Sequence, residues 1–302
     1  MTVENYEDNF EVGSQPQLVV KNIRGSVRVV PGEAGAIKVK AEKIIDNCNL
    51  DDLEMEVYQE GEDTVYAVVK QPERFTIFGV YRPCKVNFVI EAPPNTRLRI
   101  KTVSAAVEAK GFSGDLQIKT VSGAQVVEEI SGRLDLDSVS GGVTGGRLSG
   151  AAEISTVSGQ IRLTESDLPA LHARTLRGKI EAQTTLVDGP YYFSTVSGAV
   201  RLVVPEDTNC EVHASGVSGR FYTDLDLRSS TNGNRKWHLV VGEGGPGVRI
   251  KTVSGRMSLL SSFDARGSRP GYHKKTRAER ANLLTQLSAG ELSVDEALQE
   301  LT

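Results

Sequence analysis

The sequence predicts a mainly β protein: a single-chain β-solenoid of ~18-residue coils, with an antiparallel N-terminal β region and a small C-terminal α-hairpin. Three observations support this fold class. A tetrapeptide related to TVSG recurs along the chain, apolar and polar residues alternate within each repeat, and the composition changes at both ends. We expect four segments: residues 1–95 as an N-terminal β region capping the solenoid, 96–262 as the solenoid, 263–276 as a basic Gly/Pro linker and 277–302 as a helical hairpin.

The repeat indicates the architecture. The related tetrapeptides begin at residues 102, 120, 138, 156, 175, 195, 216 and 252, so the intervals are 18, 18, 18, 19, 20, 21 and 36 residues. The last interval equals two periods and predicts one further coil, without the tetrapeptide, around Trp237 and His238. Units of this length cannot hold two packed helices, and short strands bury their apolar face only by stacking on neighbours. An antiparallel sandwich is the structural alternative, but it does not explain an in-register repeat.

Apolar columns run through the aligned repeats and define the inside of the coils. Two of them are Leu98, Leu116, Leu134, Ala152 and Ile100, Ile118, Leu136, Ile154. Polar residues such as Arg99 lie between them, at the two-residue spacing of a strand. A third apolar column, Val103, Val121, Val139 and Val157, is one residue out of step. This shift predicts a corner or bulge at the Lys-Thr step of each repeat.

The Thr, Ser and Gly residues of each repeat are expected at corners between strands. Stacked hydroxyls can bond backbone groups there, and glycine adopts backbone angles that other residues resist. The expected corner residues are Thr102, Thr120, Ser122, Gly123, Ser138, Ser140, Gly141, Thr156, Ser158, Gly159, Thr195, Ser197, Gly198, Ser218, Gly219, Thr252, Ser254 and Gly255. We do not expect the recurring serine to be a nucleophile, because no histidine recurs with it as a base.

Residues 1–95 lack the repeat. Alternating strands flank the turn PGEAG at 31–35, and the segment 53–71 indicates a hairpin that turns at residues 60–63. We expect these strands to cover one end of the solenoid, whose unpaired edges would otherwise recruit other chains. The irregular run at 71–84 contains Phe75, Phe78 and Tyr81, which are candidates for docking a partner; the alternative is that they pack on their own domain.

Beyond Phe263 the composition becomes basic and then typical of helices. Leucines at helical spacing, Gly290 at a helix end and a capping box at Ser293 and Glu296 predict two short helices. Their apolar face holds the docking candidates Leu283, Leu287, Leu298 and Leu301. Basic residues of the preceding segment are candidates for contact with an anionic membrane surface, the alternative being a solvated linker. They are Arg269, Lys274, Lys275 and Arg277.

Charge and targeting signals favour the cytoplasm. The formal net charge of −4 argues against a protein whose whole surface binds nucleic acid, and no nucleic-acid partner is expected. The chain as written shows neither a secretory signal peptide nor an apolar run of membrane length. We therefore expect a cytoplasmic protein, with peripheral membrane contact through the basic segment as a further hypothesis. Cys48, Cys84 and Cys210 lack metal or disulfide spacing and are expected to be reduced.

No catalytic residue, cofactor or metal site is predicted. Asp135, Asp137 and Glu153 form an acidic grouping that would suit Ca²⁺ or glycan chemistry, but alternate charges are normal on a solvated strand face. The histidines His172, His213, His238 and His273 lack ligand spacing, so a zinc site is not expected. The glycines lack the GxxxxGK pattern of a phosphate-binding loop.

The repeated TVSG and SG markers, the passage VNFVIEAPPNTRLRIKTVSAAVEAKGFSGDLQIKTVSG at 86–123 and the terminal LLTQLSAGELSVDEALQEL at 283–301 resemble the bacterial putative-adhesin β-strand-repeat family. This family is a domain of unknown function with YvlB-like and LiaX-like members, many of which carry a short C-terminal helical domain. The resemblance implies a non-catalytic β-solenoid, in some members tied to cell-envelope stress responses and membrane-associated partners.

Two functional hypotheses follow. The first is a scaffold or regulatory protein, not an enzyme, that acts through protein–protein interaction or self-assembly at the hairpin and the solenoid ends. The rival is a surface adhesin, or a glycan-binding or glycan-cleaving β-helix protein.

Overall fold

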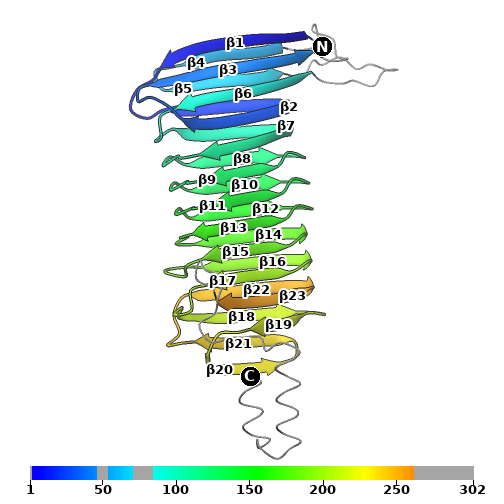
Figure 1. Cartoon of the computed structure of the whole chain (residues 1–302). Helices are drawn as coiled ribbons and strands as arrows, with labels where there is room; N and C mark the ends of the chain where they lie inside the picture. Colours follow the sequence, from blue (N-terminus) through cyan, green and yellow to red (C-terminus); the bar gives the residue numbers. More distant parts are fainter. Residues whose placement is uncertain (1, 46–53, 71–83, 262–302) are drawn as a thin grey trace, which may run out of the picture. The chain divides into compact units, whose positions relative to one another are not determined.

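The computed structural model describes residues 2–45, 54–70 and 84–261, which form β-strands joined by turns (Figure 1). Within these ranges there is no helix, and therefore none able to cross a membrane. The strands are β1 (Thr2–Glu11), β2 (Gln17–Pro31), β3 (Ala36–Ile45), β4 (Glu54–Glu60), β5 (Thr64–Lys70), β6 (Lys85–Ala92), β7 (Arg97–Lys110), β8 (Leu116–Thr120), β9 (Gln125–Glu128), β10 (Leu134–Ser138), β11 (Val143–Gly146), β12 (Ala152–Thr156), β13 (Ile161–Ser166), β14 (Leu171–Arg177), β15 (Ile180–Thr184), β16 (Tyr191–Ser197), β17 (Val200–Val204), β18 (Cys210–Gly216), β19 (Arg220–Thr223), β20 (Leu227–Gly233), β21 (Lys236–Val241), β22 (Gly247–Ser254) and β23 (Arg256–Ser261). The expected mainly β fold class is confirmed.

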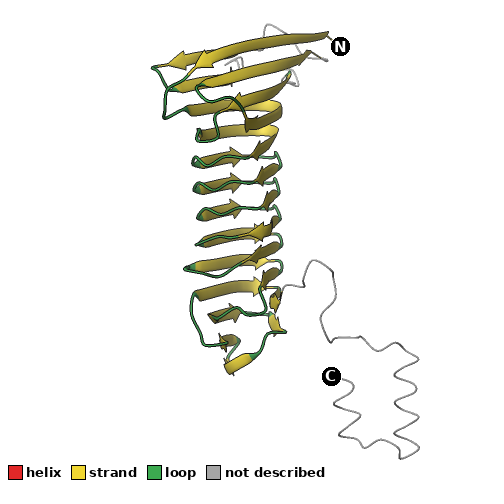
Figure 2. Cartoon of the chain, turned by 60° about the vertical axis from the view of Figure 1, so that its left-hand side comes forward, coloured by secondary structure: helices red, strands yellow, loops and turns green. Residues whose placement is uncertain are grey.

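Two parallel ladders of strands build a stack of coils (Figures 1 and 2). One ladder runs from the first half of β7 through β8, β10, β12, β14 and β16. The other runs from the second half of β7 through β9, β11, β13, β15 and β17. Equivalent residues of successive repeats pair directly, Leu98 with Leu116 and Leu116 with Leu134. This in-register parallel pairing is that of a β-solenoid, in which each coil covers the apolar edge of the next.

Alternation along these short strands places the core between the two ladders. Leu98, Ile100, Leu116 and Ile118 are at most 1% exposed and belong to one buried cluster that runs through the stack. Arg99, between the first two, is exposed. Burial of each Leu or Ile side chain stabilises the fold by roughly 1.5–3 kcal/mol, so the repeated apolar columns are the main source of stability.

The corner of each coil lies two residues later than the sequence indicated. The strand keeps its alternation through Thr102, which is 5% exposed, and the chain turns only afterwards. Val103 consequently points outward and is 45% exposed, while Val121, Val139 and Val157 are 41–44% exposed. The predicted shift at the Lys-Thr step is therefore wrong. A threonine whose hydroxyl bonds the backbone takes the inward position, and the valine goes to the surface.

The N-terminal region contributes strands to the stack of coils and further antiparallel strands that cover its end. β2 pairs in parallel with β7 from Gln17 opposite Arg97 to Val29 opposite Ala109, so the stack begins at Gln17 and not near residue 96. β5 and β6 pair with the two halves of β2. β3 and then β1 continue antiparallel beyond β6, and β4 pairs antiparallel with β5. These antiparallel strands lie at the end of the stack opposite to β20 (Figure 1).

At the other end, the order of coils departs from the order of the chain. β22 pairs with β16 on one side and with β18 on the other, so Thr252 lies beside Thr195. β23 likewise lies between β17 and β19. The hairpin β20–β21 pairs antiparallel with β18. The expectation of an extra coil around Trp237 is wrong: the long interval holds this hairpin, which covers the edge of β18, and the chain then returns to fill the place between two earlier coils.

The cysteines differ from one another. Cys84 is disulfide-bonded, so the expectation that all cysteines are reduced is wrong. Cys210 is a free thiol with no exposed surface, and its burial raises its pKa to about 11. A thiol that stays protonated and enclosed is unreactive, which makes Cys210 a core residue. Cys48 lies outside the described residues.

Candidate functional site

The corner threonines form a buried ladder of hydroxyls. Thr120 Oγ1 donates a hydrogen bond to the carbonyl oxygen of Gly123 at 3.1 Å, and Thr156 Oγ1 accepts one from the backbone N–H of Gly159 at 2.9 Å. The ladder consists of Thr102, Thr120, Ser138, Thr156, Thr175, Thr195 and Thr252, each at most 6% exposed. Six of these hydroxyls bond backbone groups at the turn, whereas Thr252 Oγ1 has no hydrogen-bond partner among the described residues. All seven are enclosed away from any substrate.

The corner glycines allow successive coils to approach each other closely. A Cβ on Gly123 would lie 1.9 Å from the carbonyl oxygen of Ala105, which no side chain can tolerate. The same holds, at 1.7–2.5 Å from a backbone oxygen, for Gly141, Gly159, Gly198, Gly219 and Gly255. The preceding serines, Ser122, Ser140, Ser158, Ser197, Ser218 and Ser254, are exposed. The backbone N–H of Ser122 donates to Val103 O at 2.8 Å, so these positions also join the coils through the backbone.

The acidic grouping on β10 and β12 is occupied by neighbouring side chains. Asp135 Oδ2 accepts a hydrogen bond from Gln117 Nε2 at 2.6 Å. Asp137 Oδ2 pairs with Lys119 Nζ at 2.7 Å, and this bond raises the pKa of the lysine. Carboxylates that are paired with neighbouring side chains are not arranged around a shared position for an ion, so the geometry of this face does not match a Ca²⁺ site.

The outward valines form a continuous aliphatic ridge, which we name the valine ridge. Its members are Val103, Val121, Val139, Val157, Leu176, Val196, Val253 and Val217, in the order in which their strands are stacked. Each is between 41% and 57% exposed. At the ~4.8 Å spacing of paired strands the ridge is about 34 Å long. A row of aliphatic side chains of this length, all facing solvent, indicates a surface for interaction.

The two flanks of the valine ridge differ. On one side lie the exposed serines and the small residues Ala106, Ala124 and Gly142. On the other side, two residues before the ridge members, lie five charged residues and three serines. The charged residues are Lys101, Lys119, Asp137, Arg174 and Lys251. The small-residue flank leaves room beside the ridge, and the charged flank carries both signs.

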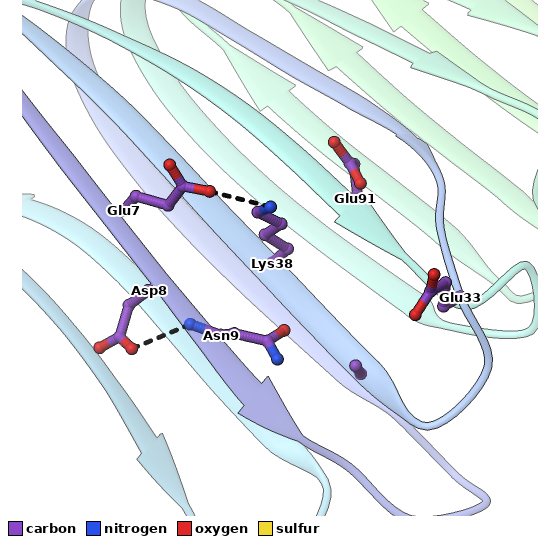
Figure 3. A pocket seen from close by; sticks show the side chains of 7 residues that line it. Glu7, Asp8, Asn9, Glu33, Lys38 and Glu91 are labelled. Atoms are coloured by element: carbon purple, nitrogen blue, oxygen red, sulfur yellow. Dashed lines mark hydrogen bonds and ion pairs between the residues drawn. The ribbon is translucent and has the colours of Figure 1, made fainter.

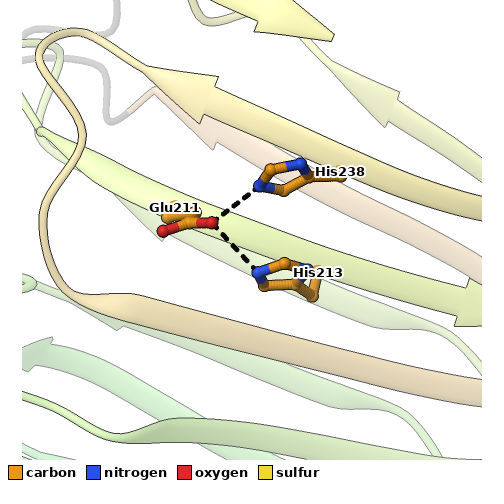
Figure 4. Close-up of side chains that lie close together, drawn as sticks. All are labelled: Glu211, His213 and His238. Atoms are coloured by element: carbon orange, nitrogen blue, oxygen red, sulfur yellow. Dashed lines mark hydrogen bonds and ion pairs between the residues drawn. The ribbon is translucent and has the colours of Figure 1, made fainter. Parts of the chain in front are cut away.

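A second cluster lies on the outer face of β18 and β21 (Figure 4). His213 and His238 are directly opposite in the antiparallel register, and their rings stack with centroids 4.4 Å apart and planes inclined by 8°. Both Nε2 atoms point at one oxygen, Glu211 Oε1, at 3.2 Å from His213 and 2.7 Å from His238. The hydrogen bond with His238, with the nearby charge of His213, lowers the pKa of Glu211.

A hollow of about 400 Å³ opens beside these histidines. Trp237, Lys236, Arg249 and Lys251 contribute to its lining. Lys251 Nζ also lies 5.8 Å from the centre of the Tyr192 ring, within reach of a cation–π contact. The hollow therefore combines aromatic faces with positive charge.

Another hollow, of about 460 Å³, lies on the N-terminal strands β1 and β3 (Figure 3). Its lining is acidic, with Glu33 and Glu91, and Lys38 Nζ pairs with Glu7 at 2.9 Å. That bond lowers the pKa of Glu7. The single lysine is thus bound by the lining itself, and the geometry favours no particular ligand.

The remaining candidates from the sequence fall outside the described residues. These are the docking residues Phe75, Phe78, Tyr81, Leu283, Leu287, Leu298 and Leu301, and the basic residues Arg269, Lys274, Lys275 and Arg277. The helical hairpin and the partners assigned to it therefore stay predictions.

Sequence reasoning missed both the valine ridge and the histidine pair. The valines were aligned as a column, but the face to which the column belongs depends on where the chain turns. His213 and His238 have no spacing typical of metal ligands, because only the pairing of β18 with β21 brings them together. The turn residues Asn232, Gly233 and Asn234 could have indicated the hairpin β20–β21, but no local pattern indicates that β21 pairs with β18.

Several solved structures are similar to this chain. No curated protein matches the chain. Among solved structures, a putative cell adhesion protein from Clostridium sporogenes is 10% identical, covering 86% of this chain and 100% of that one, with a TM-score of 0.30. A putative adhesin from Bacteroides fragilis is 11% identical, covering 86% and 97%, with a TM-score of 0.39. One from Parabacteroides merdae is also 11% identical, covering 86% and 97%, with a TM-score of 0.35.

A family model described as Toastrack DUF4097 matches residues 17–260. The match begins at the first residue of β2, where the stack of coils begins, and ends one residue before the end of β23. It includes every corner of the hydroxyl ladder and every member of the valine ridge. Because this span is well over half of the sequence, the chain belongs to the Toastrack DUF4097 family.

Proposed function

We propose that this domain is a non-catalytic scaffold that self-associates side by side through the valine ridge. The observation that carries the proposal is the unbroken row of exposed aliphatic side chains from Val103 to Val217. Burying such a row stabilises an assembly by roughly 25 cal/mol for each Å² of apolar surface removed from water. A scaffold role in envelope stress, implied by the sequence resemblance, is a narrower proposal of the same kind.

A second copy of the chain is the occupant that fits the ridge and its flanks. A twofold axis perpendicular to the stack, between the coils of Val121 and Val139, brings the first four ridge members of one copy, Val103 to Val157, against the same four of the other. The same axis places Lys119 of one copy opposite Asp137 of the other, so the charged flanks attract. The small residues Ala124 and Gly142 leave space for the partner's valines.

The size of the ridge predicts a weak contact. The four overlapping members span about 14 Å, and a strip of that length and roughly 12 Å wide buries on the order of 200 Å² per copy, well below the ~800 Å² per partner of a stable complex. We therefore expect a dissociation constant for the dimer of about hundreds of micromolar, with association strengthened where many copies are held close together.

Sedimentation equilibrium of the full chain from about 10 µM to 1 mM tests the proposal. V139K places a charge beside the proposed twofold axis, in the middle of the contact, and is expected to keep the protein monomeric throughout that range. V126K, on the exposed outer face of β9 away from the ridge, is the matched control and should associate like the wild type. A wild-type chain that is monomeric at 1 mM, or a V139K chain that still dimerises, would contradict the proposal.

A second candidate function, binding of an anionic glycan, is favoured by the hollow beside Trp237. There Lys251 lies over the Tyr192 ring and Arg249 is exposed nearby, a combination of stacking surface and positive charge. Retention on immobilised sulfated polysaccharide should fall in K251Q and be unaffected in V139K. Equal retention of K251Q and the wild type would exclude this hollow as a glycan site.

A further inference from the structure

The three side chains Glu211, His213 and His238 meet because of strand alternation and register. Glu211 and His213 are two residues apart on β18 and therefore share its outer face. His238 is the direct cross-strand neighbour of His213 on β21. Both strands are paired on two sides, β18 with β22 and β21, and β21 with β18 and β20, so their backbones are held firmly.

The ligand atoms of these residues are already close to the spacing of a metal site. One ligand atom from each of Glu211, His213 and His238 lies within 4.8 Å of the other two. Ligands of a tetrahedral zinc ion, bound at 2.0–2.2 Å, are about 3.3 Å from each other. Of the two observed nitrogen–oxygen distances, the 3.2 Å from His213 is close to that value, and the 2.7 Å from His238 needs a small separation of the two groups to admit an ion. The side chains are 44–52% exposed, so small rotations can bring the imidazoles together around an ion.

We propose that Glu211, His213 and His238 form a binding site for a divalent transition-metal ion, for which Zn²⁺ is the ion used in the test. Two imidazole nitrogens and one carboxylate oxygen suit Zn²⁺, Ni²⁺ and Cu²⁺, whereas Ca²⁺ and Mg²⁺ require more oxygen ligands. Three protein ligands leave a fourth position of the ion for water or for an external ligand.

Positively charged residues near the site determine the affinity that we expect for Zn²⁺. Arg249 is the register neighbour of His213 on β22, and Lys236 and Lys251 help to line the adjacent hollow. These positive charges oppose a divalent cation, while water screens them on this exposed face. We therefore expect a dissociation constant for Zn²⁺ on the order of 1–50 µM, weaker than that of a buried structural zinc site.

A bound ion would join two elements at the end of the stack. Its ligands lie on β18, which belongs to the last coil, and on β21, which covers that coil. An ion that binds only the folded protein raises its thermal stability as the ion concentration exceeds the dissociation constant. The site would therefore hold the covering hairpin against the coil.

Isothermal titration of the full chain with Zn²⁺ tests the site. The wild type is expected to bind one ion here, and H213N, H238N and E211Q are each expected to weaken this binding by about tenfold or more. H172N is the matched control, because His172 lies on β14, on the same outer face, in edge contact with Tyr192. His273 lies outside the described residues, and H273N controls for binding there.

Circular dichroism and the shifts of the imidazole Hε1 protons on adding Zn²⁺ complete the test. Binding lost in H213N and H238N, in chains that still melt cooperatively, with Hε1 shifts at both histidines of the wild type, would support the proposal. Unchanged affinity in H213N and H238N, binding lost only in H273N or H172N, or no binding at 200 µM Zn²⁺, would overturn it. If H238N fails to fold, the Hε1 shifts of the wild type alone decide.

Discussion

The carbonyl oxygen of Gly123 lies against Gly141 so closely that a Cβ on Gly141 would be 1.9 Å from it. The same contact recurs between Gly141 and Gly159, where the distance would be 2.1 Å. Stacked coils therefore touch through bare backbone at this corner. This contact explains why the repeat keeps glycine as its fourth letter and allows a direct test of the stacking.

G141A is expected to destabilise the protein by about 1–3 kcal/mol, because the added methyl group must push two paired coils apart. The adjacent Gly142 provides a matched control. A Cβ there would meet Gln160 O at 3.5 Å, an ordinary contact, so G142A should change the unfolding free energy little. Urea denaturation of the three chains measures the difference. Equal stability of G141A and G142A would show that the coils do not stack as described.

T156V is expected to cost about 1–3 kcal/mol, because it removes the acceptor of the Gly159 N–H inside the stack. The substitution keeps the shape of the side chain, so packing changes little. S158A, two residues later on the exposed side of the same corner, should be almost neutral. Thermal unfolding in parallel compares the two variants. A T156V chain as stable as S158A would mean that the buried hydroxyl does not matter.

Alkylation should distinguish the cysteines. Cys210 has no exposed surface and a pKa raised to about 11, so iodoacetamide at pH 8 should label it only after denaturation. A raised thiol pKa stabilises the fold below the unfolded pKa of about 8.5, and this contribution is lost as the pH rises through 11. Cys84 should stay unlabelled in denaturant until a reductant is added. Peptide mass spectrometry reads both sites, and labelling of native Cys210 would contradict the buried position.

Glu181 on β15 should contribute a pH-dependent part of the stability. It is 18% exposed, its carboxylate pairs with Lys179 and, at 3.1 Å, with Arg162, and its pKa is lowered chiefly by the hydrogen bond from Lys179. A depressed carboxyl pKa stabilises the fold above the unfolded pKa of about 4.3, and the contribution is lost as the pH falls through the folded pKa. E181Q should therefore be less stable than the wild type by about 0.5–1 kcal/mol at pH 7 and equally stable near pH 2.5. Urea denaturation at both pH values measures this, and a constant difference would exclude the ion pair as its cause.

The repeat made much of the fold predictable. Columns such as Leu98, Leu116 and Leu134 lie in one buried line because a repeat of constant length forces equivalent residues to pair. The position of the turn could not be predicted in this way, since a strand that ends before Thr102 and one that ends after it contain the same number of apolar residues. In the structure, the threonine hydroxyl determines where the turn lies. Thr102 Oγ1 donates a hydrogen bond to Ala105 O at 3.0 Å, and this bond keeps the threonine inside and Val103 outside.

By itself, the sequence determined that this chain is mainly β, that it repeats, and which residues alternate toward the core, because all three depend on local spacing. Only the tertiary structure decided which face carries the valines, that β22 returns between β16 and β18, and that His213 meets His238. These features depend on pairings between distant segments. Hydrogen bonding between strand edges selects such pairings, and local spacing does not encode them.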